Sequence, residues 1–215
     1  MLLDFHNLIS KHSMNITGVI HIGGHYGNEC DEYCKCESIK HVLFFEPDPG
    51  SFQQLNQKIH NQNNVTAINR ALGPFSCKMD LYRESWNNGQ SNSLLEPHLH
   101  KEQYPHIVFN DKLEVKVHPL DKYEPDKVFN MLNIDVQGFE LEVLRGAKKT
   151  LTQIDYIITE VNKEELYKGC ALVDEVDEYL SKFNFTRIDT KWITDTALGN
   201  YRPKNETWGD ALYIK

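Results

Sequence analysis

Residues 19–22, with the sequence Val-Ile-His-Ile, form a short apolar run that stops at Gly23 and Gly24, and Gly27 follows three positions later. An apolar run of this length that ends at glycines predicts a buried strand leading into a tight turn. Glycine in such a turn lets the backbone approach a ligand closely. The following stretch, 28–38, is compatible with a helix. We therefore predict a strand, a ligand-binding turn and a helix.

The same alternation of strand and helix continues along the chain. Apolar runs at 41–45 and 65–68 enclose a segment in which Phe52, Leu55 and Ile59 recur at helical spacing. Such alternation is typical of a parallel sheet with right-handed crossovers. We predict an α/β, Rossmann-like fold: a mostly parallel central sheet with helices on both faces. The other predicted elements are helices at 1–14, 141–151 and 173–183, and strands at 79–83, 113–117, 128–134, 156–161, 185–189 and 211–214.

Length and composition restrict the class of protein. A chain of 215 residues that is 40% hydrophobic suits one domain, predicted over 1–215. The formal net charge of −8 disfavours nucleic acid as the main partner, because phosphate binding needs a basic face. No apolar stretch approaches the length of a membrane span. An odd number of cysteines, five, and a polar start that makes a poor secretion signal favour a cytoplasmic location.

The spacing of the glycines distinguishes between cofactors. The dinucleotide fingerprint G-x-G-x-x-G would require glycine at position 22, where Ile22 stands, and this disfavours a nicotinamide-dependent reductase. The interval from Gly23 to Gly27 matches instead the G-x-x-x-G turn typical of methyltransferases, which cradles the amino-acid half of S-adenosylmethionine. We therefore assign His21, Gly23, Gly24 and Gly27 to cofactor binding.

A carboxylate closes the next predicted strand. Glu46 lies nineteen positions after Gly27, where an acid can accept hydrogen bonds from both ribose hydroxyls. Taken singly, Glu46 fits a solvated acid before a proline turn equally well, but together with the glycine turn it favours an adenosyl cofactor. Asp48, in the same turn, is assigned to this site. So is Ala71, which follows the third strand and suits either an adenine edge or simple packing.

Two further acids stand at the ends of predicted strands. Asp135 follows the run 128–134, and Glu160 lies near the end of 156–161. Because ligands of open parallel sheets bind outside the carboxyl ends of the strands, both acids are expected in one crevice, and Asp135 is also assigned to cofactor binding. The alternative role for Asp135 is to cap a helix that begins near Gly138. The two carboxylates also suit a divalent ion such as Mg²⁺, so metal dependence is left open.

In six blocks the chain resembles the FkbM-type methyltransferases. Phe-Glu-Pro-Asp-Pro at 45–49 and Asp-x-x-Gly-x-Glu-x-x-x-Leu-x-Gly-Ala from Asp135 are specific in combination. The resemblance implies a class I methyltransferase fold, S-adenosylmethionine as cofactor, and methylation of a hydroxyl oxygen, often on a sugar or a glycosylated natural product. The blocks are 21–27, 44–49, 71–73, 91–94, 134–147 and 157–161.

Two departures from the pattern affect the predicted site. His21 stands where this type of turn usually has an acid, and Gln137 stands where Glu is common. A neutral amide cannot act as a general base, so Asp135 and Glu160 become the leading catalytic candidates. The departures also keep open a non-catalytic, cofactor-binding module of a glycan-assembly protein.

Methyl transfer to a hydroxyl requires in-line positioning and a base, because a protonated hydroxyl is a poor nucleophile. Asp135 is our first candidate for the base or for a group that orients it, and Glu160 is the second. Three histidines, His98, His100 and His106, also titrate near neutrality. We expect at least two of these three to lie on a polar surface.

Two irregular segments, 85–110 and 190–209, are predicted to bind the acceptor. Both carry aromatic residues among polar ones, which suits a sugar ring, although packing over the sheet edge explains them equally well. A protein side chain or a small phenol remains the alternative acceptor. The aromatic residues are Trp86, Tyr104, Trp192, Tyr201 and Trp208.

Overall fold

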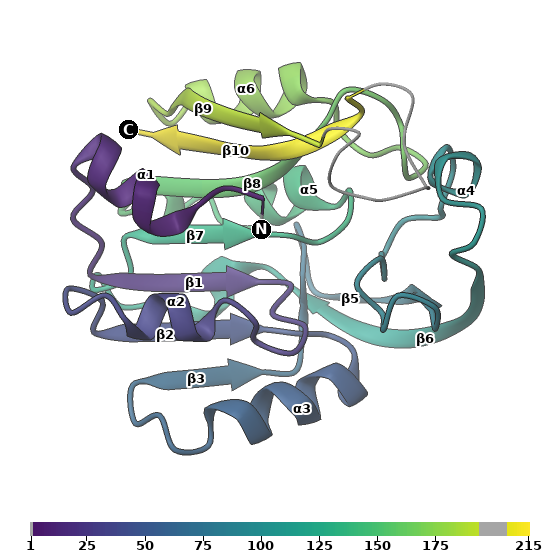
Figure 1. Cartoon of the computed structure of the whole chain (residues 1–215), viewed down its shortest axis with the longest axis horizontal. Helices are drawn as coiled ribbons and strands as arrows, with labels where there is room; N and C mark the ends of the chain where they lie inside the picture. The colour runs from purple at the N-terminus through teal and green to yellow at the C-terminus, as the bar shows by residue number, and fades with distance from the viewer. Residues whose placement is uncertain (1, 194–205) are drawn as a thin grey trace.

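The computed structural model describes residues 2–193 and 206–215. Its main feature is a seven-stranded sheet in the order β3-β2-β1-β7-β8-β10-β9 (Figure 1). The first five strands in this order run parallel, and β10 runs antiparallel to both of its neighbours. The mostly parallel sheet predicted from the sequence is thus confirmed. The strands are β1 (Gly18–Ile22), β2 (His41–Phe45), β3 (Val65–Ile68), β7 (Met131–Ile134), β8 (Tyr156–Asn162), β9 (Thr186–Trp192) and β10 (Trp208–Ile214).

Helices cover both faces of this sheet, as alternation along the strands requires. In β1, Val19 packs with the core that contains α1, α2 and α3, whereas Ile20 and Ile22 pack with the core that contains α5 and α6. No helix in the described part of the chain has the length and apolar character needed to cross a bilayer. The helices are α1 (Phe5–His12), α2 (Cys30–Cys34), α3 (Pro49–Ile59), α5 (Glu140–Arg145) and α6 (Val173–Ser181).

A second, three-stranded sheet lies beyond the carboxyl ends of the parallel strands (Figure 1). Its order is β4-β6-β5, and its apolar residues Leu81, Val115 and Val117 join the core on the α5 side of the main sheet. The antiparallel pair of β5 and β6 therefore extends one wall of the molecule past the ends of β1 and β2. The elements are β4 (Ala71–Leu72), β5 (Cys77–Glu84) and β6 (Phe109–His118), with the short helix α4 (His100–Gln103) between β5 and β6.

The boundaries differ from the predicted ones in places where a turn interrupts an apolar run. The strand predicted from 128 begins at Met131, because the Phe129 amide donates to the Asp126 carbonyl oxygen in a turn. The helix predicted over 141–151 ends at Arg145, before Gly146. The irregular segment predicted at 190–209 is strand at both ends, in β9 and β10, and its residues 194–205 lie outside the described residues.

The α5 helix holds the loop after β7 in place, so its apolar face should contribute strongly to stability. Leu144 is fully buried in this face. We expect Leu144→Ala to lower the free energy of unfolding by about 2–5 kcal/mol, measured by urea denaturation. Val108→Ala, at a position 58% exposed, is the control and should change it by less than about 0.5 kcal/mol. Equal effects of the two substitutions would contradict this assignment of the core.

Candidate functional site

A cavity of about 470 Å³ opens where the parallel strands end. Ile22 and Phe45 reach it from the ends of β1 and β2, and Asp135 and Glu160 reach it from β7 and β8. The ends of these strands therefore bring together, at the base of the cavity, side chains from distant parts of the sequence. The crevice lies between β1 and β7, which is where the strand order changes direction and where ligands of such sheets bind.

The glycine turn after β1 forms one wall of the cavity. Gly23 has φ of 88°, and a Cβ atom there would lie 1.8 Å from the carbonyl oxygen of Asp135. Its amide and that of Gly24 both donate to the Phe45 carbonyl oxygen at 2.9 Å. Gly23 lines the cavity, whereas Gly24 and Gly27 lie outside its described lining and allow the turn to pack tightly against α3. Only glycine fits this close approach of three backbone segments.

Glu46 lines the cavity from the end of β2, and so does the predicted cofactor residue Ala71. The Glu46 carboxylate accepts the His25 amide at 2.7 Å and the Asp48 amide at 2.8 Å, and this residue is 6% exposed. Burial raises the pKa of Glu46 to about 7, although the two amide donors act in the opposite direction. The carboxylate is thus fixed in orientation beside the glycine turn.

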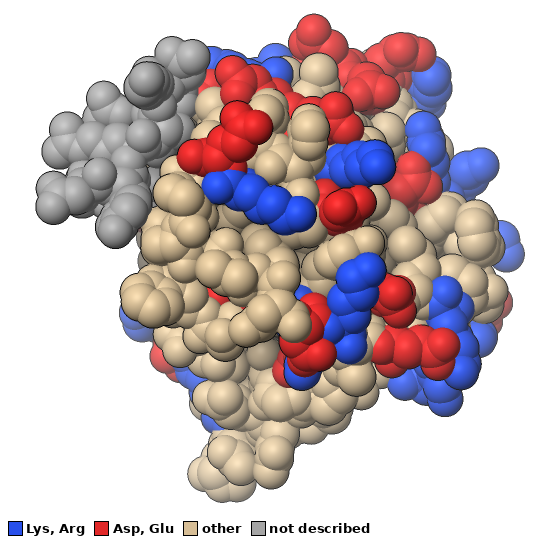
Figure 2. Space-filling view, turned by 90° about the vertical axis from the view of Figure 1, so that its right-hand side faces the viewer, with Lys and Arg blue, Asp and Glu red and all other residues tan. Residues whose placement is uncertain are grey.

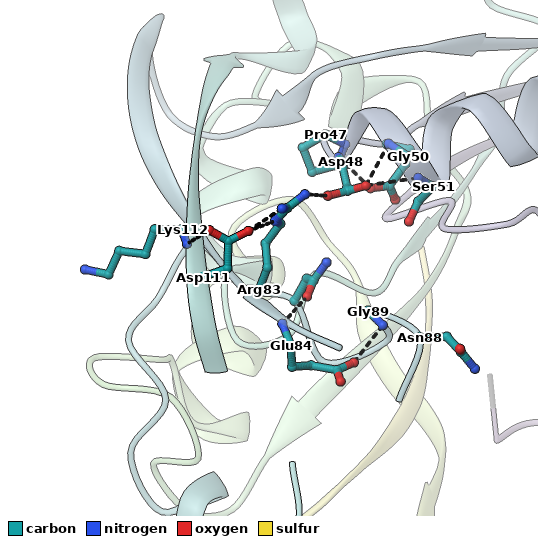
Figure 3. A network of polar contacts seen from close by, with 12 residues as sticks. Pro47, Asp48, Gly50, Ser51, Arg83, Glu84, Asn88, Gly89, Asp111 and Lys112 are labelled. Atoms are coloured by element: carbon teal, nitrogen blue, oxygen red, sulfur yellow. Dashed lines mark hydrogen bonds and ion pairs between the residues drawn. The ribbon is translucent and has the colours of Figure 1, made fainter. Parts of the chain in front are cut away.

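Asp48 lies outside the described lining of the cavity. Figure 3 shows its contacts with the start of α3 and with Arg83. Its carboxylate caps α3 by accepting the Gly50 and Ser51 amides at 2.8 and 3.0 Å, and it accepts Nη1 of Arg83 at 2.9 Å. Arg83 also donates from Nε to Asp111 on β6 at 2.9 Å. Through Arg83, Asp48 therefore links the turn after β2, which also carries Glu46, to β5 and β6 of the second sheet.

The two predicted catalytic acids are joined by one amide group. Gln137 Nε2 donates to Asp135 Oδ1 at 2.7 Å and to Glu160 Oε2 at 2.9 Å. The Tyr167 hydroxyl lies 3.0 Å from Gln137 Oε1, to which it can donate. The loop that presents Gln137 contains a positive φ, 57°, at this residue. The structure therefore brings Asp135 and Glu160 together, with Gln137 between them.

Two buried acids near this pair were missed by sequence reasoning. Glu140 Oε1 accepts the amides of Val136 and Gly138, each at 3.1 Å, so Glu140 rather than Asp135 orders the start of α5. Asp210 pairs with Glu160 across β10 and β8 and lines the cavity. The sequence signal that could have identified Glu140 is the final acid of the Asp-x-x-Gly-x-Glu pattern. The position of Asp210 becomes apparent only from the pairing of β10 with β8.

Mutual repulsion and burial act together on these acids. Burial raises the pKa of Glu160 well above its usual range, and the nearby Glu140, Asp135 and Asp210 raise it further. Burial likewise raises the pKa of Asp210. Within the described residues no group of three or more His, Cys, Asp or Glu is placed to hold a metal ion. The cavity thus carries a surplus of acidic groups, and their raised pKa values favour the protonated forms.

The opposite wall of the cavity is aromatic. His100 is 4% exposed and lines the cavity, and its Nδ1 has no hydrogen-bond partner among the described residues. The rings of Tyr104, Phe109 and Tyr167 surround it, with centroids 4.9, 5.3 and 5.3 Å away. Burial lowers the pKa of His100 to about 4, so its imidazole is neutral at pH 7.

The positions of the other candidate acceptor residues divide them into two groups. His100 is the buried one of the three histidines, whereas His98 is exposed and His106 is half-buried and lines the cavity together with His100. Tyr104 and Trp208 also line the cavity, and the Trp208 indole donates to the Tyr104 hydroxyl at 2.9 Å. Trp86 and Trp192 lie outside the described lining, and Tyr201 falls outside the described residues.

The surface at the carboxyl ends of the strands has a mixed charge. In Figure 2 this side of the molecule faces the viewer, and acidic and basic side chains are interspersed around a large area without charged groups. No broad basic area is visible among the residues described on this face. An acceptor that approaches from this side meets mostly uncharged side chains.

The free energy of unfolding should fall as the pH rises from the ordinary pKa of glutamate to the raised pKa of Glu140. Burial raises the pKa of Glu140 to about 7, whereas an unfolded chain releases this proton near pH ~4.3. The folded state therefore holds a proton that the unfolded state has lost, so the free energy of unfolding decreases between these pH values. Glu140→Gln should remove about 1–3 kcal/mol of this decrease, measured by urea denaturation at several pH values. Glu37→Gln, at an exposed position, is the control, and an unchanged slope in Glu140→Gln would contradict the expectation.

Comparisons with known proteins agree with this geometry. The family described as the methyltransferase FkbM domain matches residues 21–186. The 2-O-methyltransferase NoeI of Sinorhizobium fredii (strain NBRC 101917 / NGR234) is 23% identical over 159 residues, which cover 70% of this chain and 65% of NoeI.

Solved structures show the same fold. The crystal structure of methyltransferase FkbM from Methylobacillus flagellatus KT has a TM-score of 0.60 and 13% identity, covering 100% of this chain and 45% of that one. TrmK of M. capricolum, in complex with S-adenosyl-homocysteine, has a TM-score of 0.51 and 10% identity, covering 100% of this chain and 70% of TrmK. The chain thus spans less than two thirds of NoeI and of the M. flagellatus protein. With the family match over most of its length and the class I fold, this chain belongs to the FkbM family of S-adenosylmethionine-dependent methyltransferases.

Proposed function

We propose that this protein transfers the methyl group of S-adenosylmethionine to a hydroxyl oxygen of a sugar or glycan. The observation that carries the proposal is the meeting of Asp135 and Glu160 in one cavity, beside the glycine turn and opposite an aromatic wall. The 2-O-methyltransferase activity in the name of NoeI supports oxygen as the acceptor atom.

The residues around the glycine turn fit the cofactor. Glycine at position 23 lets the turn pack directly against the Asp135 backbone, where a Cβ would overlap, and Glu46 offers a fixed carboxylate suited to ribose hydroxyls. When bound, S-adenosylmethionine supplies an electrophilic methyl group on a positively charged sulfur. The acidic side chains that line the cavity are complementary to that charge: Glu29, Glu46, Asp135, Glu160 and Asp210.

Asp135 is the better placed of the two acids to take the proton of the acceptor. It is half-buried, it faces the cavity, and only its Oδ1 is engaged by Gln137 among the described residues. Burial raises the pKa of Glu160 and so favours its protonated form, which makes Glu160 the less suitable of the two to accept a proton. In the transfer, Asp135 would take the proton from the acceptor hydroxyl. Gln137 acts as a positioning residue for both carboxyl groups.

The aromatic wall supplies the acceptor side of the proposal. Tyr104, Tyr167 and Trp208 offer apolar rings, and neutral His100 offers an unpaired Nδ1 that can accept a hydrogen bond. Binding pockets for small molecules typically combine such an apolar lining with a few placed polar groups. A sugar, which presents both C–H faces and hydroxyl groups, matches this lining better than a charged acceptor does.

The cofactor is tested by thermal shift and calorimetry. We expect S-adenosylmethionine and S-adenosylhomocysteine to stabilise the protein by about 2.7 kcal/mol at roughly 100 times the dissociation constant. NAD is the control and should give no shift, because Ile22 replaces the first glycine of the dinucleotide fingerprint. Stabilisation by NAD alone would contradict the assignment of this cavity to the adenosyl cofactor.

The catalytic role of Asp135 is tested on a panel of methyl glycosides, with the methylated product detected by mass spectrometry. We expect Asp135→Asn to reduce kcat by about 10²-fold or more, because the amide cannot accept the proton. Asp80→Asn, at an exposed position on β5, is the matched control and should retain the activity of the original protein. Assays with EDTA and with added Mg²⁺ decide whether a metal ion participates.

Two outcomes would count against the proposal. Near-normal turnover by the Asp135→Asn variant would remove Asp135 from the mechanism. Cofactor binding without transfer to any glycoside would favour another acceptor class, such as a protein side chain or a phenol, or a binding module without activity.

A further inference from the structure

One polar side chain in the aromatic wall of the cavity lacks the hydrogen bonds that a buried polar group normally makes. Neither ring nitrogen of His100 has a hydrogen-bond partner among the described residues, and Nδ1 is buried. Leaving a buried polar atom unpaired is unfavourable, and such atoms in native proteins call for an explanation. Because His100 lines the cavity, a ligand can supply the missing partner.

The fold holds His100 in one place. Its backbone amide donates to the Leu166 carbonyl oxygen at 3.0 Å, which ties α4 to the segment that follows β8. The rings of Tyr104, Phe109 and Tyr167 pack around the imidazole and restrict its orientation. These neighbours contribute ring contacts but no hydrogen bond to the imidazole. His100 is thus a rigidly held polar group in an apolar surround.

His100 stands apart from the two acids proposed for catalysis. Tyr167 links the two parts of the cavity, because its ring contacts the imidazole and its hydroxyl lies 3.0 Å from Gln137 Oε1. Gln137 in turn donates to Asp135 and Glu160. Within the part of the chain that the structure describes, His100 makes no hydrogen bond to either acid. An acceptor whose reacting hydroxyl lies at Asp135 therefore presents a different group to His100.

A hydroxyl group matches the unpaired nitrogens of His100. Burial and the neighbouring His106 lower the pKa of His100 to about 4, so the imidazole is neutral at pH 7. A neutral imidazole has one N–H donor and one nitrogen that accepts. A hydroxyl can accept from the first or donate to the second, so it suits whichever nitrogen faces the ligand. An alcohol or phenol with a single hydroxyl, placed at Asp135, would leave His100 unpaired.

We propose that His100 determines specificity by binding a second hydroxyl group of the acceptor, so that polyhydroxylated acceptors are selected over alcohols and phenols with a single hydroxyl. The inference rests on the proposed function, which places the reacting hydroxyl at Asp135. His100 recognises the acceptor and takes no proton in the reaction. A site built to hydrogen-bond a substrate hydroxyl rejects analogues that lack it, because its own polar group is then left unpaired.

Monodeoxy analogues of the acceptor test this role. The acceptor is the methyl glycoside that the original protein methylates fastest, and each analogue lacks one hydroxyl other than the one methylated. We expect the original protein to have a kcat/KM about 10–100-fold lower for one of these analogues than for the complete glycoside. His100→Phe, which keeps an aromatic ring in the wall, should lower kcat/KM for the complete glycoside by about the same factor. It should leave kcat/KM for the sensitive analogue unchanged.

The matched control is His98→Phe, at an exposed position outside the described lining, which should discriminate among the analogues as the original protein does. Calorimetry should show that His100→Phe binds S-adenosylhomocysteine as tightly as the original protein, which separates acceptor recognition from a change in fold.

Three results would overturn the inference while leaving the proposed function intact. The first is a His100→Phe variant that discriminates among the analogues as the original protein does. The second is an equal loss of kcat/KM by this variant for the complete glycoside and for every analogue. The third is an original protein that does not discriminate at all, a result that needs no variant to fold. An original protein that methylates no glycoside would overturn the proposed function, and the inference with it.

Discussion

The parallel pairing of β1 with β7 is the constraint on which the whole site depends. It places the glycine turn against the backbone of Asp135, so closely that any Cβ at Gly23 would overlap the Asp135 carbonyl oxygen. The Asp135 amide in turn donates to the Ile22 carbonyl oxygen at 2.9 Å. The turn proposed to bind the cofactor and the carboxylate proposed to face the acceptor are thus held by the same backbone contact. Their separation cannot change without breaking the centre of the sheet.

The rigid sheet holds several buried acids close together, which is electrostatically unfavourable, and the acids reduce this repulsion by binding protons. Acids from four strands or their following loops converge on a small volume, and burial and mutual repulsion raise the pKa values of Glu46, Glu140 and Glu160. Such groups are stable when protonated and become favourable as anions when a cation enters. The negative charge of the cavity would therefore develop as the proposed cationic methyl donor binds. Concentrating buried acids in this way is unfavourable for folding, which is typical of functional sites.

Much of the sheet could be predicted because its strands are short apolar runs that end at glycine, proline or an acid. The site was only partly predictable. The predicted residues that line the cavity lie at or shortly after the ends of predicted strands, where ligands of parallel sheets bind, and such positions can be found from the order of the strands in the sequence: Gly23, Glu46, Ala71, Asp135 and Glu160. Asp210 and Glu29 do not lie at such positions: one enters through an antiparallel strand and the other from the start of a helix. The helix α5 was predicted to be too long, because the apolar spacing continues past Gly146 whereas the helix ends at Arg145.

The two departures from the family pattern become consistent once the charges are considered together. A glutamate at position 137 would place a third carboxylate between Asp135 and Glu160, in a cavity where Glu160 already cannot ionise readily. The amide of Gln137 instead donates to both carboxyl groups and needs no proton to do so. At position 21, burial lowers the pKa of His21 and favours its neutral form, which adds no negative charge to the centre of the cavity. Both changes reduce repulsion around Asp135, the group proposed to accept a proton. The departures therefore fit the proposed role of Asp135 as well as the retained acids do.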